Sequence, residues 1–224
     1  ASVGHAGASG YIAVMSLFGL APEVIKPTAL ALSILVASLA AWQFWRAGHF
    51  SWTLFWPFAL LSVPFAFLGG YLNLPAHLFK MLVGAVLLLS ATRLLLKPAQ
   101  DVKTGTPSRP LALAVGGGLG LLSGLTGTGG GIFLTPLLLF RKWARVREAA
   151  AVSALFILLN SAAGLLGTWS RARAFPDFIW VLALAVVTGG AAGAWMGSRH
   201  FPHTVIQRLL AAVLLIAGGK LLLA

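Results

Sequence analysis

The sequence predicts an all-α polytopic membrane protein that consists of two homologous four-segment repeats, inverted relative to each other. Each repeat is expected to contain a glycine-broken helix that is either re-entrant or discontinuous. Hydrophobic residues make up 59% of the 224 residues and charged residues only 9%, with a mean hydropathy of +0.93. This composition is typical of membrane proteins and not of soluble domains. Apolar segments of membrane-spanning length recur along the chain, and its two halves resemble each other.

Short connections separate the apolar segments. In chain order the segments cover residues 3–20, 27–45, 52–72, 77–96, 111–140, 149–168, 177–198 and 204–223. The only clearly polar connector, 98–110, divides the chain into a first repeat, 1–97, and a second repeat, 111–224. Six residues precede Gly7 in the first repeat, whereas about sixteen precede the equivalent Gly127 in the second. We therefore expect the first repeat to be incomplete at its N-terminus.

Glycine, proline and serine positions identify the internal repeat. The matched pairs are Gly7 with Gly127, Gly10 with Gly130 and Ser33 with Ser153 at an offset of 120 residues, and Gly70 with Gly197 and Pro75 with Pro202 at an offset of 127 residues. These residue types carry the comparison because leucine-rich segments also match by chance. Duplicated membrane segments with an interrupted helix in each half are typical of transporters whose site lies between the repeats.

The strongest interruption is the stretch 124–136 (GLTGTGGGIFLTP), which places five glycines and a proline inside an apolar segment. Each interior glycine costs a helix about 0.5–1 kcal/mol relative to alanine, and Pro136 has no N–H group to donate. Unwound backbone at membrane depth persists only where it is buried in protein or lines a cavity. The stretch therefore predicts a broken helix whose free N–H groups, near Gly131, face a small anion.

The basic residues bear on topology. The formal charge of +12 comes from 16 Lys and Arg against 4 Asp and Glu. Because the cations lie between apolar segments, we interpret them as interfacial anchors and expect no nucleic-acid partner. If both glycine-broken segments cross the bilayer, the cations divide 8 and 8 between the two faces. If each segment dips in and returns, 11 lie on one face and 5 on the other, and the positive-inside rule favours this second, inverted arrangement with a cytoplasmic connector.

The stretch 124–136, followed by residues 149–164 (AAAVSALFILLNSAAG), resembles the TauE/SafE family of sulfite exporters and related anion permeases. Residues 48–52 (GHFSW) and the two closing helices also fit, so the resemblance covers nearly the whole chain. It implies a duplicated carrier of sulfite, sulfonates or related anions in the bacterial inner membrane. The chain departs from the family pattern at residues 7–11 (GASGY) and at Val152, where the family commonly has threonine.

The candidate substrate-binding groups are glycine amides and small polar side chains at the two breaks and on the helices beside them. They belong to Gly7, Ser9, Gly10, Ser33, Thr126, Gly127, Thr128, Gly129, Gly130, Gly131, Ser153 and Asn160. Amides and hydroxyls can donate hydrogen bonds to oxyanion oxygens. The alternative is that the glycines permit close helix packing and the hydroxyls donate to carbonyls one turn earlier. The prediction includes no catalytic residue, metal or cofactor, and its partners are a small inorganic or organosulfur anion and the lipid bilayer.

Other functions stay open at this level. Residues 7–10 (GASG) match the G-x-S-G of rhomboid-type membrane proteases, with Ser9 as nucleophile and His77 as base. The internal repeat aligns Ser9 with Gly129, so the G-x-S-G motif can be explained as a diverged glycine cluster. We therefore expect that the protein is not a protease or another enzyme. An anion channel, or a proton-coupled uptake permease that uses His5, is the other alternative. The four carboxylates all fall in connectors or at the ends of predicted spans, which favours efflux driven by the membrane potential over a carboxylate proton relay.

Overall fold

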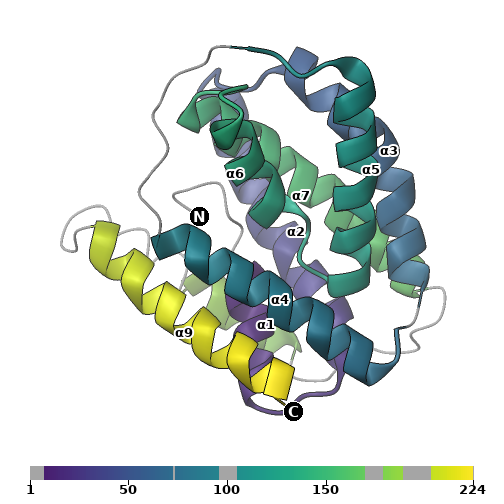
Figure 1. Ribbon diagram of the computed structural model, residues 1–224, viewed down its shortest axis with the longest axis vertical. Helices are drawn as coiled ribbons and strands as arrows, with labels where there is room; N and C mark the ends of the chain where they lie inside the picture. Colours follow the sequence, from purple (N-terminus) through teal and green to yellow (C-terminus); the bar gives the residue numbers. More distant parts are fainter. Residues whose placement is uncertain (1–7, 73, 96–104, 170–178, 189–202, 224) are drawn as a thin grey trace.

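The computed structural model describes residues 8–72, 74–95, 105–169, 179–188 and 203–223, and the regular secondary structure of that part of the chain is entirely helical. The labelled helices are α1 (Ala8–Leu17), α2 (Pro22–Arg46), α3 (Trp52–Tyr71), α4 (Ala76–Leu95), α5 (Arg109–Thr126), α6 (Gly131–Phe140), α7 (Val146–Trp169) and α9 (His203–Leu223) (Figure 1). A further helical stretch covers Ile179–Thr188. Helices α2, α3 and α7 are long and apolar enough to cross a bilayer, which confirms the predicted helical membrane class.

Helix α2 begins at Pro22, earlier than the boundary near residue 27 that the sequence predicted. Pro22 lies in the first turn, where the missing N–H group would have no intrahelical partner and the fixed φ already suits a helix. Pro27 is then accommodated inside the helix. The earlier start matters for the site, because it places Lys26 inside α2 and not in a connector.

Helix α3 packs closely against α5 through glycines on one face of α5. Side chains added at Gly116, Gly120 and Gly124 would collide with the backbone of Phe58, Ser62 and Ala66, respectively. The residue numbers of the α5 glycines and of their α3 partners increase together, so α3 and α5 run parallel. Glycines spaced one turn apart allow this approach because nothing separates the two backbones.

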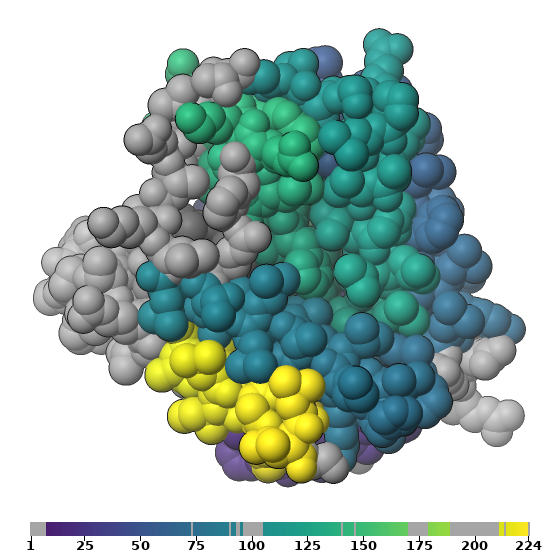
Figure 2. Space-filling model, in the orientation of Figure 1, coloured from purple at the N-terminus to yellow at the C-terminus, as the bar shows by residue number. Residues whose placement is uncertain are grey.

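Two pairs of helices, α2 with α7 and α4 with α9, cross in antiparallel fashion. In the pair α2 and α7, Ala37 and Ile157 share a buried cluster, and Leu30 lies against Gly164. In the pair α4 and α9, Gly84 lies against both Gly218 and Leu222. Figure 2 shows α4 and α9 side by side on one face, with α5 above them.

The buried apolar residues form two main clusters. One joins α1, α4 and α9 with the beginning of α2, and the other joins α3, α5, α6 and α7. Helix α6 contributes Leu134 and Leu138, both fully buried, to the second cluster. The α5–α6 connection therefore lies inside a body formed mostly by α3, α5 and α7.

Candidate functional site

The connection between α5 and α6 is unwound over four residues that contain three glycines. Gly127, Gly129 and Gly130 have φ values of 78°, 72° and 79°, in the left-handed region that glycine adopts without steric cost. The Gly127 N–H group donates to the Ser123 carbonyl at 2.8 Å and closes α5. Helix α6 then begins at Gly131 with Gly130 as its N-cap.

The segment from Gly105 to Lys142 enters the molecule and returns to the same end. The Gly105 N–H group donates to the Lys142 carbonyl at 3.3 Å, so the residues that precede α5 meet those that follow α6. Figure 1 shows α5 descending from one end of the molecule and α6 returning toward it. The turn between the two helices is consequently buried in the interior.

The amides at this turn are unpaired. The first backbone hydrogen bonds of α6 are donated by Phe133 and Leu134, both to the Gly130 carbonyl. In the part of the chain that the structure describes, the N–H groups of residues 129–132 donate to no backbone carbonyl. Such groups at a helix N-terminus carry a partial positive charge and commonly bind anions.

The turn packs directly on α7. A Cβ atom added at Gly129 would lie 2.7 Å from Ile157 Cγ2 and 2.9 Å from Ser161 Oγ. A Cβ atom added at Gly130 would lie 2.9 Å from Phe156 Cε1. Both positions therefore require glycine for space as well as for backbone conformation.

Two hydroxyl groups of the candidate set use their protons within the protein. Thr126 Oγ1 donates to the Leu122 carbonyl at 2.7 Å, one turn earlier in α5. Thr126 Oγ1 also lies 3.0 Å from Thr128 Oγ1. Because the single Thr126 proton is engaged by Leu122, Thr128 must be the donor of this second bond. Ser153 is also paired, since its hydroxyl accepts a hydrogen bond from Thr135 Oγ1 on α6 at 2.8 Å.

Other buried polar groups near the turn have no partner. Among the described residues, buried side-chain atoms without a hydrogen bond are Ser16 Oγ, Thr28 Oγ1, Ser33 Oγ, Ser123 Oγ, Asn160 Nδ2 and Ser161 Oγ. Asn160 accepts a bond from Ser62 Oγ at 2.6 Å through Oδ1, which leaves only its Nδ2 donor unpaired. The antiparallel register that joins Leu30 to Gly164 and Ala37 to Ile157 places Ser33 level with Ser161.

Sequence reasoning missed Ser123 and Ser161. The Ser161 hydroxyl points toward Gly129, and the Ser123 Cβ atom lies 3.4 Å from the position that a Gly130 Cβ would take. Both side chains are fully buried. The available signal was their position, because Ser161 directly follows Asn160 and Ser123 directly precedes the glycine-rich stretch.

Lys26 is a second feature that the sequence did not reveal. Its ammonium group is buried and donates to the carbonyls of Gly69, Gly70 and Leu72 at 2.8, 2.9 and 3.1 Å. These carbonyls lie at the end of α3, where a helix favours a positive charge. The Lys26 Cα atom would lie 3.3 Å from a Cβ added at Gly127, so the beginning of α2 meets the α5–α6 turn here.

The candidates predicted at the first-half break lie elsewhere or outside the described residues. Gly7 and His5 lie outside the described residues. Ser9 is buried in the first turn of α1, and Gly10 is an ordinary helical residue of α1 rather than a helix cap. Helix α1 packs on α9, α2 and α4, whereas α6 packs on α7. Within the described part of the chain, no hydrogen bond joins Ser9 to His77.

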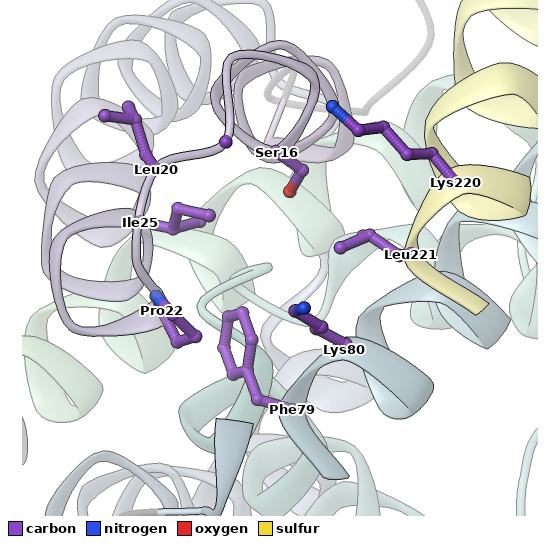
Figure 3. Close-up of a pocket in the computed structure, with 9 residues that line it drawn as sticks. Ser16, Leu20, Pro22, Ile25, Phe79, Lys80, Lys220 and Leu221 are labelled. Atoms are coloured by element: carbon purple, nitrogen blue, oxygen red, sulfur yellow. The ribbon is translucent and has the colours of Figure 1, made fainter. Parts of the chain in front are cut away.

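A cavity of about 120 Å³ lies between α1, α2, α4 and α9. Figure 3 shows Phe79, Ile25 and Leu221 around it, with the side chains of Lys80 and Lys220 at its margin. The Lys220 ammonium donates to the Leu17 carbonyl at 2.8 Å, at the end of α1. An apolar wall with cationic heads at its edge is the arrangement expected of lysines that extend toward the membrane surface, and the cavity shares no lining residue with the α5–α6 turn.

Comparison with known proteins agrees with the helical membrane architecture. Residues 1–221 match the family model described as Sulfite exporter TauE/SafE. The chain is 42% identical over 192 residues to the "Probable membrane transporter protein y4hK" of Sinorhizobium fredii, an alignment that covers 83% of this chain and 78% of that protein. No solved structure gives a significant match. With the apolar helices, these similarities identify a multi-pass membrane transporter, and the chain belongs to the TauE/SafE sulfite exporter family.

Proposed function

We propose that this protein exports a small sulfur-containing anion, such as sulfite, a sulfonate or a related oxyanion, across the bacterial inner membrane. The observation that carries the proposal is the buried α5–α6 turn, where the unpaired amides of residues 129–132 cap the N-terminus of α6. Backbone donors fixed in this way offset negative charge without a change of protonation. The proposed binding groups are the glycine amides predicted at the second-half break, since the Thr126 and Thr128 hydroxyls are engaged within the protein.

The α5–α6 segment is proposed to be re-entrant. The hydrogen bond between Gly105 and Lys142 supports this interpretation, because both ends of the segment then lie at one end of the molecule. Helix α6 has only 10 residues, which is about half of what a full crossing needs. Short broken helices that end near the middle of the bilayer are the usual site-forming elements of secondary transporters.

The inverted repeat is also a proposal, and the helix crossings support it. Ala37 and Ile157, which contact each other where α2 and α7 cross, are equivalent at the offset of 120 residues. At the offset of 127 residues, the contact between Gly84 and Gly218 has the equivalent pair Ala211 and Ala91, and both alanines lie in one buried cluster. Equivalent helices that cross in antiparallel fashion at equivalent residues are expected of a two-fold axis in the membrane plane.

The orientation follows from the basic residues. The connections α2–α3 and α6–α7 lie at the same end of the molecule as the start of α5. The cations at these positions are Arg46, Arg109, Arg141, Lys142, Arg145 and Arg147. The positive-inside rule makes this end cytoplasmic.

The energetics favour efflux. Of the described carboxylates, Glu23 and Glu148 lie in the first turns of α2 and α7, and not in the middle of a span. Because a bacterial interior is electrically negative, each unit of negative charge that leaves gains about 2.3 kcal/mol per 100 mV. Export of an anion therefore needs no coupled ion, whereas concentrative uptake does.

The test is flux through the purified protein in liposomes, with sulfite, sulfate, thiosulfate, small sulfonates and carboxylates as substrates. We expect saturable movement of at least one sulfur oxyanion, with counter-transport, that responds to an imposed potential without a pH gradient. Flux that does not saturate would identify a channel. Flux that follows a proton gradient and ignores the potential would identify a proton-coupled permease, and flux of carboxylates alone would refute the substrate class.

A further inference from the structure

The hydroxyl groups around the α5–α6 turn differ in whether their protons are available. The deprotonated oxygens of an oxyanion accept hydrogen bonds and donate none, so only groups with a spare proton can bind them. Thr126 donates its proton to the Leu122 carbonyl, and Thr128 donates its proton to Thr126 Oγ1. Neither threonine has a proton left for a ligand.

Three residues beside the turn carry polar groups that have no hydrogen-bond partner among the described residues. Ser123 Oγ, Asn160 Nδ2 and Ser161 Oγ are at most 1% exposed and have no partner within the described structure. Ser123 faces Gly130 and Ser161 faces Gly129 across the turn. Asn160 lies on the same face of α7, three residues after Ile157 and four after Phe156, which meet Gly129 and Gly130. Buried donors without a partner are rare in proteins because each lost hydrogen bond costs about 1–3 kcal/mol. Their position beside four unpaired amides indicates that a bound ligand accepts their hydrogen bonds.

Among the residues whose burial the structure describes, Lys26 is the only charged residue that is buried. The buried Lys26 ammonium binds three neutral carbonyls, which satisfy its hydrogen bonds but leave its charge uncompensated. Its acceptors Gly69 and Gly70 pack on Leu125 of α5 and on Gly164 of α7. Glu23, one turn earlier in α2, is exposed, so its charge is screened by solvent.

We propose that the site takes a singly charged oxyanion, which accepts hydrogen bonds from Ser123, Asn160 and Ser161 while the buried Lys26 balances its charge. This inference rests on the proposed function and adds the residues and the charge state. One negative charge leaves the site neutral, whereas a dianion leaves one charge uncompensated in a medium of low dielectric constant. The desolvation cost rises with the square of the charge, so the second charge is the expensive one. A sulfonate or hydrogen sulfite therefore fits, and sulfate or fully ionised sulfite does not.

The donor assignment is tested with Ser161→Ala, Ser123→Ala and Asn160→Ala in the liposome flux assay. Loss of one net hydrogen bond should raise the half-saturation concentration of methanesulfonate about 2- to 10-fold for each variant. The matched control is Ser38→Ala, which removes an exposed hydroxyl of α2 that already donates to the Leu35 carbonyl at 2.9 Å. We expect unchanged half-saturation for this control. Unchanged values for all three test variants would overturn the donor assignment.

The charge state is tested in the unaltered protein, so the result does not depend on the folding of a variant. Methanesulfonate and sulfate have similar size and differ in charge by one unit. We expect a preference for methanesulfonate on the order of tenfold or more. Equal or tighter binding of sulfate would overturn the inference. If Gly130→Val abolishes flux in the same experiments, the proposed function stands even where this inference fails, whereas absence of any oxyanion flux removes both.

Discussion

Replacement of Gly130 by valine tests whether the α5–α6 turn is the transport site. Gly130 caps α6 with a φ of 79°, a conformation in which a β-branched residue is a steric outlier. The new Cβ atom would also fall 2.9 Å from Phe156 Cε1. The Phe156 ring is 1% exposed and belongs to the buried cluster around α6, so it cannot yield without disturbing its neighbours.

The free-energy cost of Gly130→Val has two contributions, the backbone conformation and the steric clash with Phe156. A left-handed conformation costs a residue with a side chain about 1–2 kcal/mol. Overpacking of a well-filled core costs about 1–3 kcal/mol more. The sum, about 2–5 kcal/mol, can be relieved if the turn changes shape, because the turn itself contributes little apolar burial. We therefore expect Gly130→Val to lose substrate flux while the protein still inserts in the membrane and keeps its helix content.

Two matched controls separate backbone strain from lack of space. Gly48 has a φ of 72° with nothing within 4 Å of its added Cβ, and Gly118 is a helical glycine with equally open surroundings. Gly48→Val incurs only the cost of the left-handed backbone conformation, at a position remote from the turn. Gly118→Val incurs neither this cost nor a steric clash. Both controls should retain flux close to that of the unaltered protein.

The assay combines flux in liposomes with circular dichroism and size-exclusion profiles of the purified variants. Flux of Gly130→Val equal to that of the unaltered protein would refute the assignment of the turn as the substrate site. Equal losses in Gly130→Val and Gly48→Val would show that strain anywhere in the fold, and not the site, limits transport.

Three further predictions follow from the structure. Lys26→Met should remove the hydrogen bonds to the Gly69, Gly70 and Leu72 carbonyls, of which Gly70 keeps a second donor, Thr168 Oγ1 at 3.2 Å. It should lower the free energy of unfolding in detergent by about 2 kcal/mol, measured by tryptophan fluorescence, whereas Lys220→Met, at an exposed residue, should change it little. Because the sequence contains no cysteine, Arg109→Cys and Arg141→Cys can be labelled individually with an impermeant thiol reagent, and labelling from opposite sides would disprove a re-entrant α5–α6 segment. Anion efflux from liposomes should increase when the interior is made electrically negative at constant pH, and an unchanged rate would exclude electrogenic export.

The sequence alone predicts a helical membrane protein, because this class depends on properties of single segments. Hydrophobic length and the absence of interior carboxylates are features of single segments, and they identify a helical membrane protein without knowledge of contacts. The family resemblance is also local, because it depends on two contiguous stretches, residues 124–136 and 149–164. The comparisons confirm it.

The tertiary structure decided which polar groups remain available, because hydrogen-bond pairing depends on the register between helices that are distant in the sequence. Thr126 and Thr128 are equivalent to Ser161 by composition, yet only Ser161 retains a free proton once the turn is folded onto α7. The position of Lys26 in the sequence indicates an interfacial anchor, but its partners lie 43 to 46 residues away at the end of α3. Local sequence specifies where a helix must break, and only the packing of other helices around the break specifies which donors and which charge a ligand meets there.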